Sequence, residues 1–309
     1  MREEIEKATL KSLLNFYTSL KADLGVRCVL YGNLLKVHAQ EYVQAILPVL
    51  RDTKNQFIDP PFHPTLQYAP GTYLKTSSYP NLDEKASVAD VSFILGPTPW
   101  NGDKLHSSEA LYTRALLARI TATILQEPLF SELRSKQQLG YSVFSKYVPH
   151  FGIDYIHLCV QGTEHSSVVM VNAIFNFLKQ FRDVVEDFDI DHLNLIINSV
   201  KQDILSRPSN PLNKILLLVN ELFSPDPQYN RQELYLLALE RVDKDKLLHF
   251  YDTYILGDSS RKFILLSDSA FSGSYDDISV PNVISLNSTQ NVSLQPFLYW
   301  RFTHLGISL

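Results

Sequence analysis

The order of strand-like and helix-like segments between residues 71 and 268 is the strongest constraint on how this chain can fold. Two segments, 71-GTYLKTSSY-79 and 87-SVADVSFIL-95, alternate apolar and polar residues as half-buried strands do. The segments 141-YSVFSKYV-148 and 151-FGIDYIHLCVQG-162 alternate in the same way on either side of Pro149-His150, which predicts an antiparallel pair. A last buried strand is predicted at 262–268.

Helical periodicity fills most of the remaining chain. Apolar residues recur at three- and four-residue spacing over 107–126, 165–183, 190–206, 211–223 and 230–255. Strands and helices are interleaved without a strict βαβ alternation. The predicted fold class is therefore α+β, an αβ sandwich with an antiparallel-rich sheet packed on helices. Pro128 suits the first turn of a helix, so 128–139 is predicted as a separate short helix closed by Gly140.

A proline-rich segment predicts a domain boundary. Residues 55–70 contain Pro60, Pro61, Pro64 and Pro70, which lack backbone N–H donors and favour an extended connection. Before it, the patterns predict a helix over 5–24, a strand over 26–31 and a helix over 37–50. After the last strand the chain is rich in Ser, Asp and Asn. The predicted organisation is one domain part over 1–58, a linker over 59–70, a domain over 71–268 and a partly mobile tail over 269–309.

Charge and cysteine usage exclude several classes of protein. The formal net charge of −5 argues against a broad surface for nucleic acid or anionic lipid. Cys28 and Cys159 each lie in an apolar, strand-like run, which predicts two buried thiols and a reducing compartment. The first residues carry acids and no long apolar stretch, so neither a signal peptide nor a membrane anchor is expected. A cytoplasmic location is predicted.

Metal and nucleophile motifs are missing from the sequence. The inverted zinc-peptidase motif H-x-x-E-H has two near matches, 106-HSSEA-110 and 161-QGTEH-165, and each lacks one of the two histidines. The histidines His63, His157 and His249 are scattered, which favours structural or surface roles. No G-x-S-x-G elbow, P-loop or G-x-G-x-x-G appears. No metal site is predicted in this chain.

One long segment carries a family resemblance. The stretch EPLFSELRSKQQLGYSVFS at 127–145 resembles the corresponding segment of the insulin-degrading-enzyme branch of the inverzincin metallopeptidases, the pitrilysin-like family. Its core, L-R-x-K-x-Q-L-G-Y, spans nine positions from 133 to 141 and is far more specific than a three-residue motif. Upstream, 31-YGNL-34 resembles the strand-to-turn segment that ends the third domain of such proteins.

The resemblance implies an architecture and partners. Family members have four similar αβ domains in two halves that close around a peptide chamber, and zinc and its H-x-x-E-H site belong to the first domain. The chain would then be the zinc-lacking C-terminal half, with 1–58 ending the third domain and 71–268 forming the fourth. It would be inactive alone, with a peptide substrate and the N-terminal catalytic half as partners. Self-association into a homo-oligomer stays open, and neither nucleic acid nor membrane is expected as a partner.

The resemblance also assigns roles to three residues. Tyr141 matches a tyrosine that stabilises the oxyanion at zinc, and Arg134 matches an arginine that holds the substrate backbone. Gly140 is expected to let the strand begin with Tyr141 facing inward. These roles suit a zinc metalloendopeptidase, and peptide pheromone processing is one open subtype. The alternative is a non-catalytic binding or regulatory module derived from the same family.

Overall fold

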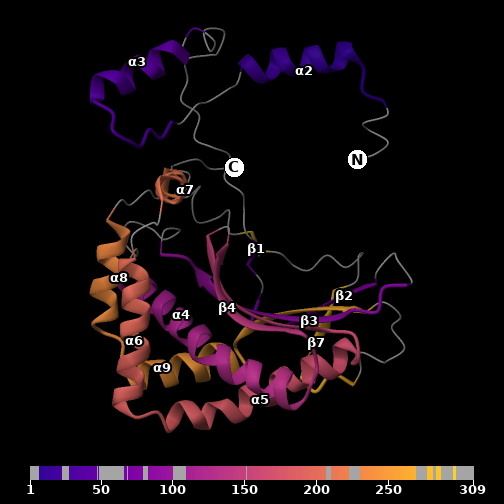
Figure 1. Cartoon of the computed structure of the whole chain (residues 1–309). Helices are drawn as coiled ribbons and strands as arrows, with labels where there is room; N and C mark the ends of the chain where they lie inside the picture. The colour runs from indigo at the N-terminus through magenta and orange to yellow at the C-terminus, as the bar shows by residue number, and fades with distance from the viewer. Residues whose placement is uncertain are drawn as a thin grey trace. The chain divides into compact units, whose positions relative to one another are not determined.

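The chain divides into two compact units, described here from a computed structural model. Unit 1 comprises residues 1–62 and 207–229, and unit 2 comprises residues 63–206 and 230–309. Each unit has its own set of elements, labelled in Figure 1. The structure describes residues 7–22, 28–46, 48, 66–67, 69–78, 83–99, 109–150, 152–206, 210–222, 230–268, 277–280, 283–286 and 295–296.

A six-stranded mixed sheet forms the centre of unit 2, in the order β4-β5-β3-β6-β2-β7. Its strands are β2 (Gly71–Ser78), β3 (Ser87–Pro97), β4 (Ser142–His150), β5 (Ile153–Gly162), β6 (Arg261–Asp268) and β7 (Val283–Ser285). The neighbours from β4 to β6 pair antiparallel, whereas β2 pairs parallel with both β6 and β7. This confirms the predicted antiparallel-rich sheet. A separate short antiparallel pair joins β1 (Leu66–Gln67) to β8 (Gln295–Pro296).

Helices pack on one face of this sheet, as Figure 1 shows for α4 and α5. The helices of unit 2 are α4 (Glu109–Leu129), α5 (Ser167–Glu186), α6 (Ile190–Leu205), α8 (Arg231–Leu239) and α9 (Lys244–Phe250), with π-helical turns η2 (Phe130–Lys136) and η3 (Tyr251–Leu256). Alternate residues of β3, including Val91 and Phe93, are fully buried beneath them. The ring of Phe93 meets Phe175 of α5 edge to face, with centroids 6.4 Å apart. The predicted α+β class is thereby confirmed.

The predicted separate helix over 128–139 is wrong. Pro128 lies inside α4, and α4 runs directly into η2. Leu125, Leu129 and Leu133 are fully buried at four-residue spacing, so one apolar face continues through the proline. A proline inside a helix removes one helical hydrogen bond, and its ring clashes with the preceding turn. Packing of the leucines therefore outweighs the local break.

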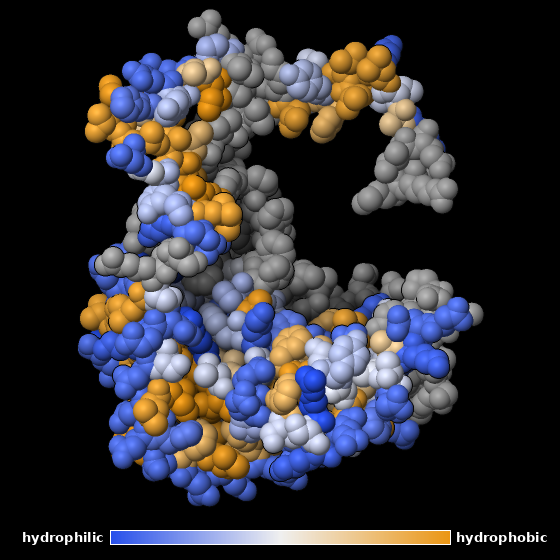
Figure 2. All heavy atoms as spheres, in the orientation of Figure 1, coloured by the Kyte–Doolittle hydropathy of each residue, from blue (hydrophilic) through white to orange (hydrophobic). Residues whose placement is uncertain are grey.

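Unit 1 differs from unit 2 in that its described helices contain no buried side chain. They are α2 (Leu10–Ala22), α3 (Lys36–Ile46) and α7 (Pro211–Leu222). Leu10, Leu13 and Phe16 of α2 are 61–73% exposed, and Leu212 of α7 is 62% exposed. Figure 2 shows apolar side chains in orange on the surface of this unit. The helices are amphipathic, as predicted, yet their apolar faces have no covering layer among the described residues.

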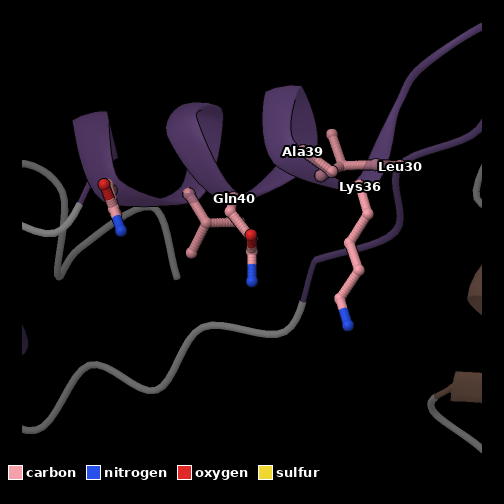
Figure 3. A pocket seen from close by; sticks show the side chains of 6 residues that line it. Leu30, Lys36, Ala39 and Gln40 are labelled. Carbon is pink, nitrogen blue, oxygen red and sulfur yellow. The ribbon is translucent and has the colours of Figure 1, made fainter.

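An open hollow of about 340 Å³ lies in unit 1 between α3 and the turn before it (Figure 3). It is lined by Leu30, Lys36, Ala39, Gln40, Val43 and Gln44. Lys36 and Gln40 point to the same side of α3 because they are four residues apart. Its lining includes no carboxylate, histidine or cysteine.

Two expectations in the first 62 residues are corrected. Cys28–Tyr31 do not form a strand, and residues 26 and 27 lie outside the described part. A strand needs a ladder partner, and unit 1 contains none among its described residues. Cys28 is consequently exposed rather than buried, whereas Cys159 is buried as predicted.

Several predicted segments fall partly or wholly outside the described residues. The linker 59–70 is described only at 66–67 and 69–70, and the tail 269–309 only at 277–280, 283–286 and 295–296. Within that tail, β7 pairs with β2. Among the helices that the structure describes, none combines the length and apolarity needed to cross a bilayer.

Candidate functional site

The three residues singled out from the sequence lie in the segment that runs from η2 through the following turn to β4. The N–H of Leu139 donates to the carbonyl of Leu133 at 2.9 Å and closes the helical segment. Gln138 has a φ of 55°, the left-handed conformation that commonly ends a helix. Gln138 therefore makes the helix end, and the prediction that Gly140 closes it is wrong.

Gly140 is required for a different reason, the close approach of two backbones. A Cβ at Gly140 would lie 2.3 Å from the carbonyl oxygen of Gln161 and 3.2 Å from Cγ1 of Val160, both in β5. From the other side, a Cβ at Gly162 would lie 2.7 Å from Cα of Gly140. The turn is thus pressed directly onto the last residues of β5, which fixes the position of the next residue, Tyr141.

Tyr141 stands at the start of β4 with its side chain 54% exposed. The next residue, Ser142, already pairs with Gln161 in the sheet. The phenol is therefore held by an ordered backbone and is open to a molecule outside the unit. A hydroxyl in this position can donate one hydrogen bond.

Arg134 lies on η2, one turn before the helix end, and its side chain is exposed. Its guanidinium carbon lies 4.8 Å from the ring centroid of Phe130, within cation–π range. The neighbouring Glu132 is occupied by Lys136 and Gln137, which donate to it at 2.9 and 3.0 Å and hold its pKa below the ordinary value. The guanidinium therefore rests on the Phe130 ring while the Arg134 side chain stays exposed.

The described residues contain no group of three His, Cys, Asp or Glu side chains placed to hold a metal ion. The residues of the near match 161-QGTEH-165 end β5 and form the turn after it. His249 is exposed in the last turn of α9. His63 and the near match at 106–110, apart from its last two residues, lie outside the described part. The donor set of the described residues does not fit a zinc site.

One polar cluster was missed in the sequence. Nδ1 of His157 on β5 lies 3.2 Å from Oδ1 of Asp90 on β3, and the hydroxyl of Ser92 lies 3.4 Å from the imidazole. Ser92 and His157 are directly opposed in the sheet. Only the strand register reveals this cluster, since His157 is far in sequence from Asp90 and Ser92.

Comparisons with known proteins agree with this fold. Residues 120–215 match the family model "PQQ synthase PqqF-like, C-terminal lobe domain 4". Insulin-degrading enzyme of Drosophila melanogaster is 23% identical over 85% of this chain and 26% of its own length. The A-factor-processing enzyme of Saccharomyces cerevisiae is 25% identical over 48% of this chain and 14% of its own length. The crystal structure of pitrilysin matches with a TM-score of 0.77 at 15% identity, covering 94% of this chain and 29% of that one.

The family-model match and the fold make this chain similar to the C-terminal lobe domains of M16-type peptidases. The chain is a partial, C-terminal relative of insulin-degrading enzyme, nardilysin and the pitrilysin-like M16 proteases, which confirms the family predicted from 127–145. It spans about a quarter of the length of the insulin-degrading enzymes that it matches.

Proposed function

We propose that this chain is the C-terminal, zinc-lacking half of an insulin-degrading-type zinc metalloendopeptidase and forms part of the wall of its peptide chamber. In this proposal residues 1–58 end a third αβ domain, 59–70 link it onward, 71–268 form a fourth domain and 269–309 are a partly mobile tail. The observation that carries the proposal is the turn at 133–141. It combines the family's sequence pattern with an exposed arginine and an exposed tyrosine on a closely packed backbone.

Tyr141 is assigned the role of oxyanion donor. Its half-exposed phenol, held at the start of β4, is able to reach a substrate bound outside this unit. A donor aimed at a tetrahedral intermediate stabilises charge that develops only in the transition state, and losing one such donor costs on the order of 3 kcal/mol.

Arg134 is assigned to the substrate backbone. A guanidinium is planar, permanently charged and able to donate two parallel hydrogen bonds to carbonyl oxygens. Its packing over Phe130 limits the freedom lost when a peptide binds. Gly140 contributes indirectly, because it brings the turn onto β5.

Zinc, in this proposal, belongs to the N-terminal half. When bound there, a zinc ion activates water for attack on a peptide carbonyl. The described residues of this chain do not supply its ligands. Their contribution is limited to binding and orienting the peptide and to donating a hydrogen bond from Tyr141.

An N-terminal catalytic half is the proposed partner. The exposed apolar faces of α2, α3 and α7 support a further folded layer of the same protein, because apolar patches of this kind mark interaction surfaces. The same apolar faces could instead be covered by a second copy of this chain in a homo-oligomer. A cytoplasmic location, expected from the sequence, stays part of it.

The decisive experiment combines this chain with its matching catalytic half and measures cleavage of a quenched fluorescent peptide. Tyr141→Phe is expected to lower kcat about 10²–10³-fold with peptide binding retained. Tyr31→Phe, which removes an exposed hydroxyl outside α2, α3 and α7, is the control and should leave kcat unchanged. An unchanged kcat in Tyr141→Phe would remove the catalytic role. Zinc-dependent cleavage by the chain alone would contradict the assignment of metal to the other half.

A second candidate function is a non-catalytic binding or regulatory module. It is favoured by the lack of a metal-ligand group among the described residues. In that case the chain binds a peptide or a full-length relative. Tyr141→Phe should then leave kcat of the complex with the catalytic half unchanged. The subtype, general peptide degradation or peptide pheromone processing, would be tested by offering both kinds of peptide to the complex.

A further inference from the structure

A buried carboxylate lies at the far end of the β4–β5 pair from Tyr141. Asp154, the second residue of β5, has no exposed surface. The hydroxyl of Tyr147 on β4 donates to its Oδ1 at 2.7 Å. Its second oxygen, Oδ2, has no hydrogen-bond partner among the described residues. Burying an ionised carboxylate has a large free-energy cost when the hydrogen bonds that it made with water are not replaced.

The nearest cation does not make up for this loss. Nη2 of Arg114 on α4 lies 3.7 Å from Asp154 Oδ2, which is too far for a hydrogen bond. That nitrogen donates instead to the carbonyl of Pro97, and Arg114 Nε is buried without a partner among the described residues. Gly96 makes room for this guanidinium, since a Cβ there would lie 3.0 Å from Arg114 Nη1. The pair is close but unsatisfied on both sides.

Tyrosines extend the cluster to a further helix. Tyr235 on α8 lies close to Asp154, because the charge of that carboxylate adds to the burial that raises the pKa of the Tyr235 phenol. Tyr235 also packs edge to face on Tyr112 of α4, with centroids 5.0 Å apart. Burial raises the pKa of both Tyr147 and Tyr235, which keeps the two phenols neutral.

We propose that Asp154, Arg114, Tyr147 and Tyr235 form a pH-sensitive clasp that ties the β4–β5 pair to α4 and α8 and loosens when Asp154 loses its proton. The titratable groups facing Asp154 are Tyr147 from β4, Arg114 from α4 and Tyr235 from α8. A neutral carboxyl needs less solvation than an ion and fits this dry cluster. The ionised form recovers lost hydrogen bonds by admitting water, which separates the strands from the helices.

The direction of the pH dependence follows from burial. Burial raises the pKa of Asp154 to about 6, and the hydrogen bond from Tyr147 and the charge of Arg114 oppose this rise without cancelling it. An unfolded aspartate titrates near about 4, so the folded state holds an extra proton between the two values. The clasp is therefore tightest below about pH 4 and loses stability as the pH rises through about 6.

Hydrogen–deuterium exchange of the whole chain tests the proposal, with rates corrected for intrinsic pH dependence. Between about pH 5 and about pH 7.5, opening of the 146–157 region is expected to increase roughly tenfold. Asp154→Asn keeps an acceptor for Tyr147 and cannot ionise, so its opening should not change with pH. Asp183→Asn, at an exposed site on α5, is the matched control and should behave like the unmodified chain.

Two outcomes would overturn the clasp: equal protection of the unmodified chain at both pH values, or a pH response retained in Asp154→Asn. If Asp154→Asn does not fold, Tyr147→Phe provides the second test. It removes a hydrogen bond to the ionised form, so the transition should move to higher pH. A transition that stays in place in Tyr147→Phe would also contradict the proposal. None of these results depends on the proposed peptidase function.

Discussion

The backbone at Gly140 lies so close to Gln161 that a single added carbon at Gly140 would come within 2.3 Å of the Gln161 carbonyl oxygen. No flexible side chain can move aside here, because the obstacle is backbone in the sheet. This contact also fixes the backbone position of Tyr141, because Tyr141 is the next residue along the chain.

Gly140→Ala is expected to push the turn away from β5 and to lower the free energy of unfolding by about 1–3 kcal/mol. Urea denaturation followed by circular dichroism measures the loss. The neighbouring Ser142→Ala keeps the backbone contact and serves as the control. If Gly140→Ala unfolds at the same urea concentration as the unmodified chain, the close approach does not constrain the turn.

Gln126→Ala is expected to destabilise the edge of the sheet. β4 is an edge strand, and Oε1 of Gln126 accepts a hydrogen bond from the N–H of Ser145 at 2.8 Å. Removing the acceptor leaves a buried donor without a partner, which costs about 1–3 kcal/mol. Thermal unfolding should show the decrease, while Gln180→Ala on the exposed side of α5 should not.

The two cysteines should differ sharply in reactivity. Cys28 is exposed, whereas Cys159 is buried, and burial together with the charge of Asp90 raises the pKa of its thiol to about 12. Because the thiolate is the reactive form, iodoacetamide at about pH 8 should modify Cys28 and spare Cys159 until urea is added. Intact mass spectrometry counts the modifications. Modification of Cys159 in the folded Cys28→Ser variant would contradict the buried position.

Arg134→Lys keeps the positive charge and removes the planar fork. In the complex with the catalytic half, KM is expected to rise roughly tenfold with little change in kcat, as for a residue that binds ground state and transition state alike. Arg119→Lys on α4 is the control, since Arg119 is a partly exposed arginine that meets Asp203 at 3.4 Å. Equal effects of the two substitutions would argue for a general loss of surface charge.

Local pattern was sufficient to predict most elements. The antiparallel pair of β4 and β5 follows from alternation, because each side chain position has a fixed face in a strand. The predicted connection at Pro149-His150 is wrong, since both residues belong to β4 and pair with Asp154 and Ile153 of β5. Amphipathic helices such as α5 follow from the spacing of residues like Phe177 and Phe181, which stack at 5.3 Å. The helix start predicted at Pro128 is wrong. Packing of the buried leucines on either side of Pro128 outweighs the local helix-breaking tendency of the proline.

Long-range relationships were not predictable from one sequence. The parallel pairing of β2 with β6 joins strands from opposite ends of unit 2, and no periodicity encodes that choice. For the same reason the contact between Gly140 and Gln161 and the cluster around Asp154 became visible only in the fold. The roles of Arg134 and Tyr141 came from the family pattern, and their turnover effects remain predictions.

Unit 1 is assembled from two stretches, 1–62 and 207–229, that enclose most of unit 2 in the order of the chain. During synthesis, α2 and α3 therefore leave the ribosome long before α7. A deletion that removes only the first 62 residues would leave α7 behind with its exposed leucines Leu212, Leu216 and Leu217. Any attempt to isolate unit 2 for study must accordingly replace 207–229 with a polar linker as well.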